Sequence, residues 1–500
     1  MLVHILAPAI LGIHAYPVHI ELRISRGFRF TLVGLPDHSV RESHERIQSA
    51  LQTNGMDVPR KQIVINMAPA DLKKEGTQFD LPLAVAIIAA NQYVPVESLE
   101  KTLFMGELSL DGTLRSQRGV LSAALMAKET GQKRILVPRV NANEAAAVEG
   151  LDVYGFDHIR EVVDFLRQPD SCKPVQACSQ APAKGEIPDF SEVKGHEWVK
   201  RAITIACAGG HNVLMCGAPG TGKTMIAKRI PGILPKMNTE EAIETTRIHS
   251  AAGIFKAGQS LIEERPFRSP HHSVSGLALL GGGSRIQPGE ISLAHNGVLY
   301  LDELPEFQRH VLEMLRQPLE EGKVHISRAL HKVEYPASFM LVASMNPCPC
   351  GYYRVPNHTC HCKPGQIQTY HNRISGPLLD RIDLQLGVAA LTFEQLQQQK
   401  TGKSSFEMRE QILQIRDRQR WRVNAQSHGK PLMQWIKPTE KALLLLKSRM
   451  ETQFFSARTY EKVLRVARTI ADLENSEHVN ETHVAEAMQY RLNDINKGFC

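Results

Sequence analysis

The stretch Gly217-Ala218-Pro219-Gly220-Thr221-Gly222-Lys223-Thr224 decides the fold class of this 500-residue chain. It follows residues 212–216, which have the pattern of a buried strand, and precedes residues 225–230, which have the pattern of a helix. Glycines in such a strand–loop–helix unit let backbone N–H groups surround phosphate oxygens at a helix N-terminus. We then expect Lys223 to contact the β and γ phosphates of a nucleotide and Thr224 to bind Mg²⁺. The stretch therefore predicts a P-loop in an α/β nucleotide-binding domain.

Two carboxylates, Asp302 and Glu303, follow four apolar residues at a point 79 residues beyond Lys223. A buried parallel strand would deliver Asp302 to the metal, and Glu303 would polarise the water that attacks the γ-phosphate. Asn346 follows a further apolar segment, residues 339–344, and its amide can orient that water and sense the γ-phosphate. The pattern predicts hydrolysis of ATP rather than nucleotide binding alone.

Composition and charge describe an ordinary globular protein. Apolar residues make up 42% of the chain and charged residues 22%, and the net charge is +7. This mildly basic balance permits a polyanionic partner without requiring one. Apolar runs are far shorter than the roughly 18–20 residues that a membrane span requires, and the first 13 residues lack the basic start of a signal peptide. We therefore expect a cytoplasmic protein with no membrane partner.

Changes in pattern divide the chain into four segments. Residues 1–166 mix strand and helix patterns, as in an α+β domain, and include strands at 18–24 and 28–33 joined by a turn at Arg26-Gly27. Residues 167–188 are proline-rich and have little apolar periodicity, so they are interpreted as a linker. We expect the ATPase core over residues 189–390 and a helical lid over residues 391–500. The chain is therefore predicted to be a multidomain α/β protein.

A tight cysteine cluster lies directly after Asn346, within residues 346–363. Two C-x-C pairs can supply four thiolates in the tetrahedral arrangement of a structural Zn²⁺ site, although His358 or His361 could replace one thiolate. Free thiols in a reducing compartment are the alternative. The four cysteines are Cys348, Cys350, Cys360 and Cys362.

In these motifs the chain resembles AAA+ ATPases of the Mg-chelatase-like group, and more specifically the ComM/YifB family of bacterial competence proteins. The resemblance covers essentially the whole chain. It implies a Lon-protease-like N-terminal α+β domain, an AAA+ P-loop core with an insert in its second helix, and a Mg-chelatase-type helical C-terminal domain. The other segments that carry the resemblance are Val33-Gly34-Leu35-Pro36, 189–196, 265–272, 289–297, 373–383 and Ser456-Ala457-Arg458.

The resemblance assigns roles to two arginines. Arg381 resembles the arginine finger that reaches the ATP of an adjacent subunit, with Arg373 as the alternative, and Arg458 resembles the sensor arginine of the lid. A guanidinium suits both roles because it stays charged and forks toward phosphate oxygens. A finger that acts in trans implies a ring, and this group typically forms hexamers. Residues 193–195 would line the adenine side by analogy.

Two segments are expected to meet DNA. Residues 275–288 occupy the place of the helix insert, and residues 327–336 have the pattern of a hairpin. Basic side chains at such tips would follow a phosphate backbone without reading its sequence. Ordinary solvated loops are the alternative. The candidate contacts are Arg285, Arg328, His331 and Lys332.

The N-terminal segment departs from the Lon pattern at two positions. Gln78 stands where the family has its nucleophilic serine, and Ala123 stands where it has its catalytic lysine. Without the hydroxyl nucleophile and its amine base, this type of peptide hydrolysis cannot proceed. We therefore interpret residues 1–166 as a non-proteolytic module for ring assembly or DNA binding.

These observations lead to one main functional prediction. The resemblance implies an ATP-driven hexameric motor on single-stranded and branched DNA, a branch-migration helicase that promotes homologous recombination during natural transformation. Recombination proteins are among its expected partners, and ATP, Mg²⁺ and a structural Zn²⁺ are its expected cofactors. The alternative is a Mg-chelatase-like chaperone or remodelling ATPase acting on a protein partner.

Overall fold

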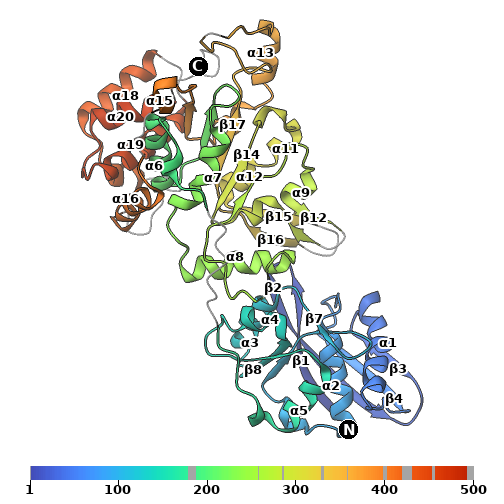
Figure 1. Cartoon of the computed structure of the whole chain (residues 1–500). Coiled ribbons are helices and arrows are strands. Elements are labelled where there is room, and N and C mark those ends of the chain that lie inside the picture. The colour runs from blue at the N-terminus through green and yellow to red at the C-terminus, as the bar shows by residue number, and fades with distance from the viewer. Residues whose placement is uncertain are drawn as a thin grey trace. The chain divides into compact units, whose positions relative to one another are not determined.

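The computed structural model describes residues 2–177, 187–256, 258–283, 286–327, 332–356, 358–397, 402–418, 431–452 and 456–491. The chain forms two compact units, shown in Figure 1. The first consists of Met1–Ala183 with Thr239–Ile262, and the second of Lys184–Asn238 with Glu263–Cys500. In the described part of the chain, no helix combines the length and the apolar character that crossing a membrane requires.

The first unit is built on a seven-stranded mixed sheet with the order β3-β4-β2-β1-β5-β8-β9. The strand pairs β1–β2 and β2–β4 are antiparallel, whereas β3–β4, β1–β5, β5–β8 and β8–β9 are parallel. The strands are β1 (Leu2–Leu11), β2 (His14–Ser25), β3 (Phe30–Val33), β4 (Gln62–Ala68), β5 (Thr102–Phe104), β8 (Arg134–Pro138) and β9 (Asp152–Phe156).

Helices cover both faces of this sheet, because successive residues of a strand point to opposite sides. Val3 and Ile5 of β1 pack in one apolar cluster with α1 (His38–Thr53), α2 (Asp80–Ala90) and α5 (Ile159–Arg167). Leu6 packs in a second cluster with α3 (Val120–Glu129) and α4 (Arg139–Ala145). Every residue of α2 is buried, which explains its continuous apolar sequence.

The order of the strands corrects one expectation. The two strands predicted on either side of Arg26-Gly27 both form, but they are not neighbours, because β4 lies between β2 and β3. Gly27 has φ +133°, a conformation that side chains rarely adopt, and it lets the chain cross the start of β4. Strand β1 had no counterpart among the predicted elements.

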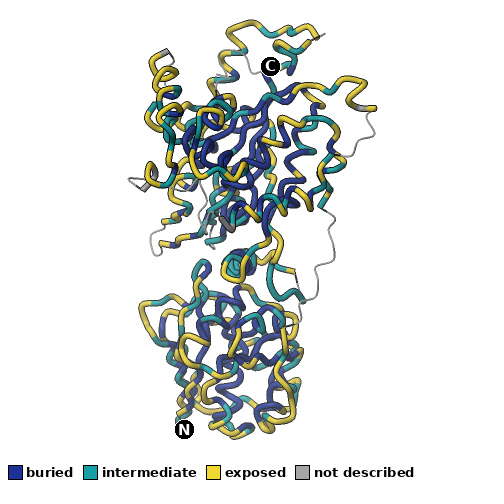
Figure 2. The backbone as a smooth tube through the Cα atoms, turned by 90° about the vertical axis from the view of Figure 1, so that its left-hand side faces the viewer, coloured by how far each residue is buried: buried dark blue, intermediate teal, exposed yellow. Residues whose placement is uncertain are grey.

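The second unit contains a five-stranded sheet in which all neighbouring strands are parallel, in the order β11-β14-β17-β10-β18. Its central strands are completely buried and appear dark blue in Figure 2, as expected for apolar runs covered on both faces. The strands are β11 (Phe267–Arg268), β14 (Val298–Leu301), β17 (Met340–Met345), β10 (Val213–Cys216) and β18 (Leu384–Gly387).

Two hairpins project from this α/β core. The first, β12 (Gly281–Gly282) with β13 (Gln287–Pro288), is an insertion between α9 (Gly276–Leu280) and α10 (Glu290–Leu293). The second pairs β15 (Lys323–Ser327) with β16 (Lys332–Pro336). Tyr335 of β16 donates a hydrogen bond of 3.0 Å to the carbonyl oxygen of Ile286. The two segments that were expected to meet DNA, 275–288 and 327–336, are therefore neighbours.

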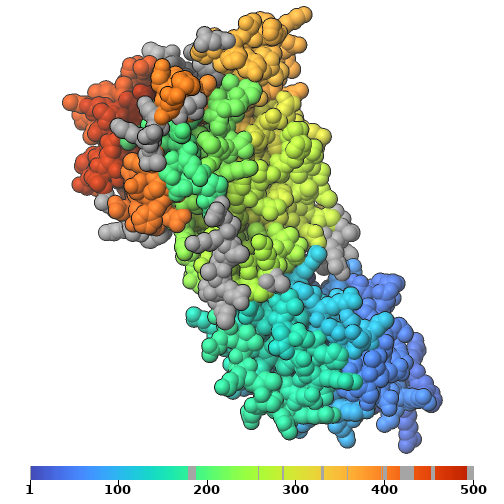
Figure 3. All heavy atoms as spheres, viewed as in Figure 1, coloured from blue at the N-terminus to red at the C-terminus, as the bar shows by residue number. Residues whose placement is uncertain are grey.

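The described residues after 391 are mainly helical, as predicted, and Figure 3 shows them in orange and red beside the α/β core. All of these helices except the first, α15, contribute to one apolar cluster with α6 (Glu197–Gly209), α7 (Lys223–Ile233) and the sheet. The helices are α15 (Phe393–Gln397), α16 (Ser405–Arg418), α17 (Pro431–Ile436), α18 (Glu440–Thr452), α19 (Ala457–Leu473) and α20 (Glu481–Gln489).

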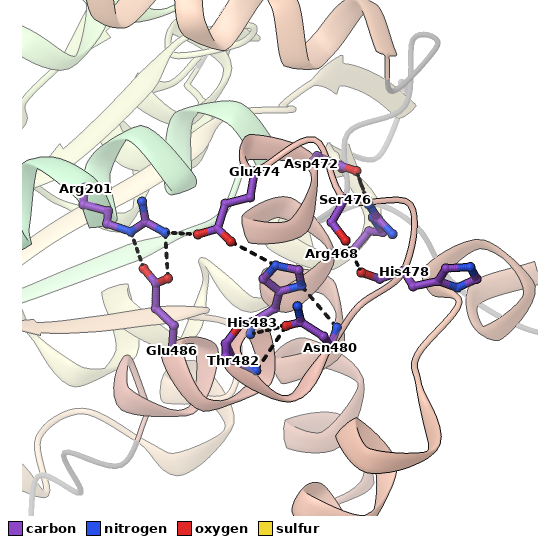
Figure 4. A network of polar contacts seen from close by, with 10 residues as sticks. All are labelled: Arg201, Arg468, Asp472, Glu474, Ser476, His478, Asn480, Thr482, His483 and Glu486. Carbon is purple, nitrogen blue, oxygen red and sulfur yellow. Dashed lines mark hydrogen bonds and ion pairs between the residues drawn. The ribbon is translucent and has the colours of Figure 1, made fainter.

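A polar network on the second unit joins these helices to α6 (Figure 4). Arg201 of α6 donates to both carboxylate oxygens of Glu486 at 2.6 and 2.8 Å and to Glu474 at 2.8 Å. His483 of α20 lies 3.1 Å from the other oxygen of Glu474. Contacts in this network fix the position of α20 on α6.

A buried ion pair joins α19 to the sheet, and we expect its loss to destabilise the second unit. Lys462 Nζ lies 2.9 Å from the carboxylate of Asp383, which precedes β18. Burial alone would raise the pKa of Asp383, but the charges and hydrogen bonds of Lys462 and His211 together outweigh it and hold that pKa well below its ordinary value. The stabilisation is therefore present above the ordinary carboxyl pKa of about 4 and is lost as the pH falls through the folded-state value.

Removing one partner of this pair leaves a buried charge, so Lys462→Met should lower the free energy of unfolding by about 3–5 kcal/mol at neutral pH. Urea unfolding followed by circular dichroism measures this change. The double variant Lys462→Met/Asp383→Leu should recover much of the stability, because both charges are then gone. A change below about 1 kcal/mol in the single variant, within the range of exposed pairs, would contradict the prediction.

Helix α8 (Thr239–Ala252) and the residues up to Ile262 cluster with the first unit, although the sequence placed them within the ATPase core. Ser250 of α8 donates to Glu144 Oε1 at 2.5 Å and accepts from the backbone N–H of Gly119 at 2.8 Å. Arg247 donates to the carbonyl oxygen of Ile13 at 2.9 Å. These partners are more than 100 residues away, so no local pattern could indicate this assignment.

Candidate active site

The P-loop connects β10 to α7, and Lys223 is the first residue of α7. Gly222 has φ +87°, which a glycine adopts freely. A Cβ at Gly217 would lie 2.3 Å from the carbonyl oxygen of Val388, so only glycine fits there. Lys223 Nζ donates to the carbonyl oxygen of Gly217 at 2.6 Å and to Asn346 Oδ1 at 3.2 Å. The loop thus brings its lysine to the tip of β17.

Asp302 lies beside the P-loop threonine. Thr224 Oγ1 donates to Asp302 Oδ2 at 2.8 Å, and Ser344 Oγ donates to Asp302 Oδ1. Burial would raise the pKa of Asp302, but these hydrogen bonds outweigh it and hold the pKa below its ordinary value. An ionised carboxylate beside a hydroxyl is an oxygen donor set that suits Mg²⁺. Thr224 and Asp302 therefore fit the magnesium ion that accompanies a bound nucleotide.

Two polar residues of this cluster were not predicted as site residues from the sequence. Tyr300 of β14 has its hydroxyl 3.1 Å from Ser344 Oγ and 3.3 Å from Thr224 Oγ1. Burial raises the pKa of Tyr300 to about 12, so the hydroxyl stays protonated and can donate. Both Tyr300 and Ser344 stand inside apolar runs, which indicated only buried strands. The available signal was that their two strands, β14 and β17, end at the same edge of the sheet.

Glu303 has φ +53°, an uncommon value for a residue other than glycine. Its side chain is 53% exposed, and Oε2 lies 3.5 Å from His272 Nδ1. Its backbone N–H donates to Asp302 Oδ1 at 3.0 Å. His272 reaches this place because β11 runs parallel to β14, so the residues that follow both strands meet at one edge. The sequence offered the pair His271-His272 after β11 as a signal, but no role was assigned to it.

Asn346 occupies the centre of the site, because β17 lies between β10 and β14 in the sheet. The backbone of Asn346 is hydrogen-bonded to the hydroxyl of Tyr370, whose pKa is raised by burial. Tyr370 belongs to α13 (Pro364–His371), and the next residue, His371, lies 2.9 Å from the carbonyl oxygen of Pro347. Helix α13 therefore fixes the backbone that carries the Asn346 amide.

The three predicted arginines differ in their surroundings. Arg381 pairs with Glu320 and is 18% exposed, whereas Arg373 pairs with Glu306 at 2.9 Å and is 48% exposed. Arg458 is the second residue of α19 and is exposed, and no hydrogen bond or ion pair joins its side chain to another residue of the described ranges. Gly195, on the expected adenine side, packs so closely on Leu391 that a Cβ would lie 2.6 Å from its side chain.

The four loop cysteines come together. Their Sγ atoms all lie within 4.8 Å of one another, and those of Cys348, Cys350 and Cys360 are 3.3–3.7 Å apart. Zinc–sulfur bonds of about 2.3 Å in a tetrahedron place sulfur atoms about 3.8 Å apart, so the donor set fits Zn²⁺. A Cβ at Gly351 would lie 2.6 Å from Pro219 Cδ, so this loop packs directly on the P-loop.

We expect purified protein to contain about one zinc ion per chain, which inductively coupled plasma mass spectrometry measures. Cys360→Ser should lower this content and the melting temperature, because a structural zinc contributes folding energy. Cys172→Ser changes an exposed thiol far from the cluster in sequence and serves as the matched control. Metal-free wild-type protein with a melting temperature unchanged by added zinc would contradict the prediction.

The remaining predicted residues lie outside the nucleotide site or outside the described residues. Lys332 is exposed at the start of β16, whereas Arg285, Arg328 and His331 fall outside the described ranges. Gln78 donates to the carbonyl oxygen of Glu75 at 2.7 Å, directly before α2. Ala123 is fully buried in α3.

Three family models together cover most of the chain. The model described as "Magnesium chelatase, subunit ChlI" matches residues 189–396. The models described as "Subunit ChlI of Mg-chelatase" and "Magnesium chelatase, subunit ChlI C-terminal" match residues 20–141 and 402–491. They thus match parts of both compact units.

Similarity to individual proteins extends over nearly the full length. YifB of Escherichia coli (strain K12) is 42% identical over 500 residues, which are 97% of this chain and 96% of YifB. Competence protein ComM of Haemophilus influenzae is 42% identical over 492 residues, with the same coverage of 97% and 96%. The magnesium-chelatase 38 kDa subunit of Cereibacter sphaeroides is 26% identical over 174 residues, 32% of this chain and 52% of that subunit. The chain therefore belongs to the ComM/YifB family of Mg-chelatase-like AAA+ ATPases.

Proposed function

We propose that this protein hydrolyses ATP at the site formed by the P-loop and the edge that carries Asp302, Glu303 and Asn346. Residues 217–224 hold the phosphates, with Lys223 on the β and γ phosphates and Thr224 and Asp302 on Mg²⁺. Glu303 takes the proton of the attacking water, and Asn346 orients that water. The observation that carries this proposal is the meeting of Lys223, Thr224, Asp302 and Asn346 within hydrogen-bond distances of 2.8–3.2 Å.

We further propose that the energy of hydrolysis drives a hexameric ring along DNA. The full-length similarity to competence protein ComM supports a role in natural transformation, as a branch-migration helicase that promotes homologous recombination in the cytoplasm. Arg381 would act as the finger on the neighbouring subunit's ATP, and Arg458 as the sensor of the lid. The two adjacent hairpins, with Lys332 at the start of β16, support a DNA contact in that part of the second unit.

The first unit would serve this motor without proteolysis. Its Lon-like character is part of the proposal, and so are the predicted domain limits of 1–166, 167–188, 189–390 and 391–500. Gln78 and Ala123 supply neither a hydroxyl nucleophile nor an amine base, which removes the chemistry of a Ser–Lys protease. Ring assembly or DNA binding is the role that then remains for this unit.

A remodelling ATPase that acts on a protein partner is the second candidate. The similarity to the magnesium-chelatase subunit of Cereibacter sphaeroides, over 174 residues, favours it. That similarity spans only 32% of this chain, whereas the similarity to competence protein ComM spans 97%. The broader similarity is the reason to place the DNA motor first.

The deciding experiment measures phosphate release by the purified chain with no DNA, with single-stranded DNA and with forked DNA. Stimulation by DNA that is lost at high salt and absent in Glu303→Gln would support the motor, because phosphate contacts weaken as salt rises. ATPase activity that no DNA changes would overturn the motor and leave the remodelling ATPase. A branch-migration assay on a synthetic four-way junction then tests the helicase activity itself.

A further inference from the structure

The loop between β2 and β3 carries a solvent-exposed aromatic ring among cations. Phe28 is 91% exposed, more than any other large apolar residue in the described part of the chain. Arg26 and Arg29 flank it and are exposed, and so are Arg60 and Lys61, which precede β4. We call these five residues the basic–aromatic tip.

The strand pairing brings the two halves of the tip together. Ser25 at the end of β2 faces Gln62 at the start of β4, and on the other side of β4 Phe30 faces Ile63. The backbone N–H of Ile63 donates to the carbonyl oxygen of Arg29 at 2.9 Å. Residues 26–29 and 60–61 therefore share one end of three adjacent strands, β3, β4 and β2, of which Figure 1 shows β3 and β4 at the right of the first unit.

The two segments that form this end of the sheet carry only positively charged side chains. Residues 22–36 and 58–70 contain five cations, the fifth being Arg23, and no aspartate or glutamate. No ion pair among the described residues involves any of these cations. The acidic residues that border the two segments are Glu21, Asp37, Asp57 and Asp71; Glu21 accepts from Asn66, and Asp37 caps α1.

Unpaired cations around one exposed ring match the chemistry of single-stranded nucleic acid. Proteins that bind single-stranded nucleic acid stack its bases on aromatic side chains and hold its phosphates with arginine and lysine. A duplex hides the faces of its bases inside the stack, and a membrane surface is bound through a larger apolar face than one ring offers. An apolar protein groove does not match a ring surrounded by cations.

We propose that the basic–aromatic tip binds a single strand of nucleic acid, with a base stacked on Phe28 and phosphates on Arg26, Arg29, Arg60 and Lys61. This inference rests on the proposed action on DNA and adds a contact in the first unit, apart from the two hairpins. It gives the non-proteolytic unit a function of its own, namely to hold unpaired DNA.

The test measures binding of the full chain to a fluorescein-labelled 30-nucleotide oligo(dT) and to a duplex of equal length by anisotropy. Phe28→Ala should weaken oligo(dT) binding about 5-fold or more, the lower range for loss of one stacked base. The double variant Arg26→Ala/Arg29→Ala should also lower the slope of log affinity against log salt by about 1.4, which corresponds to two phosphate contacts on a single strand. Melting temperatures verify that each variant is folded.

The matched control is Lys128→Ala/Lys133→Ala, which removes two exposed charges elsewhere on the same unit and should leave oligo(dT) binding unchanged.

Several outcomes would contradict parts of the proposal. If the wild type binds DNA and the tip variants bind it with the same affinity, the tip is not the binding site, and the proposed DNA motor is unaffected. Equal losses for duplex and oligo(dT) would overturn the stacking of a base. Loss of binding to anionic lipid vesicles with unchanged oligo(dT) binding would assign the tip to a membrane surface. A wild type that binds no DNA would contradict both the proposed DNA motor and the proposed binding site at the tip.

Discussion

Glu303→Gln is expected to keep nucleotide binding and to lower the rate of ATP hydrolysis by about 10²–10⁴-fold, the usual contribution of a general base. The amide has nearly the same shape as the carboxylate but cannot accept the proton of the attacking water. Binding should persist because Lys223, Thr224 and Asp302, which would hold phosphates and Mg²⁺, are unchanged, and the hydrogen bonds of Lys223 to Gly217 and of Thr224 to Asp302 do not involve Glu303. Exposure of Glu303 at the edge of the sheet gives its carboxylate access to water.

Phosphate release at saturating ATP measures the rate, and fluorescence of a labelled ATP analogue measures binding. Lys223→Ala should lose binding itself, which separates the two roles. Glu264→Gln removes an exposed carboxylate in the same unit and serves as the matched control. Turnover by Glu303→Gln at the wild-type rate would show that another group takes the proton, and His272, 3.5 Å from Glu303, would be the next residue to test.

Arg381→Ala is expected to lower the rate of hydrolysis by about 10³-fold or more, the range measured for arginine fingers in related phosphoryl transfers. The guanidinium of Arg381 pairs with Glu320 in the single chain and would exchange that partner for the γ-phosphate of a neighbouring subunit. Arg381→Lys should not restore the rate, because a lysine lacks the planar fork that reaches two phosphate oxygens. Arg373→Ala is the parallel variant, since Arg373 is the alternative finger.

Mixing two inactive variants tests whether the finger acts in trans. Chains with Arg381→Ala keep Glu303, and chains with Glu303→Gln keep Arg381, so a mixed ring contains sites with both groups. We expect the mixture to recover part of the activity that neither variant has alone. Light scattering must first show that the mixed chains assemble. An assembled mixture without recovered activity would contradict a finger supplied by the neighbour, and recovery with Arg373→Ala instead would assign the role to that residue.

Much of the nucleotide site could be predicted from local patterns. The P-loop, the strand before Asp302 and the strand before Asn346 all form within a residue or two of their predicted positions. Each depends on an apolar run followed by a few polar residues, and burial of such a run needs no knowledge of its neighbours. The C-terminal helices were predicted for a similar reason, since their 3.6-residue periodicity is local.

The partners of these residues could not be predicted in the same way. Ser344, Tyr300 and His272 join the site only because β11, β14 and β17 are parallel neighbours in the sheet. The separation of β2 from β3 by β4 likewise depends on residues about 40 positions apart in the chain.

The sequence by itself determined the P-loop, the carboxylates and amide at the strand ends, the cysteine cluster and the helical C-terminal region. Only the tertiary structure decided the order of the strands, the contact of Gly351 with Pro219 and the place of α8 in the first unit. The reason is separation along the chain, because the apolar periodicity and the turn residues that a sequence shows relate positions only a few residues apart. Ser250 and Glu144, in contrast, meet across 106 residues through a hydrogen bond that exists only in the folded chain.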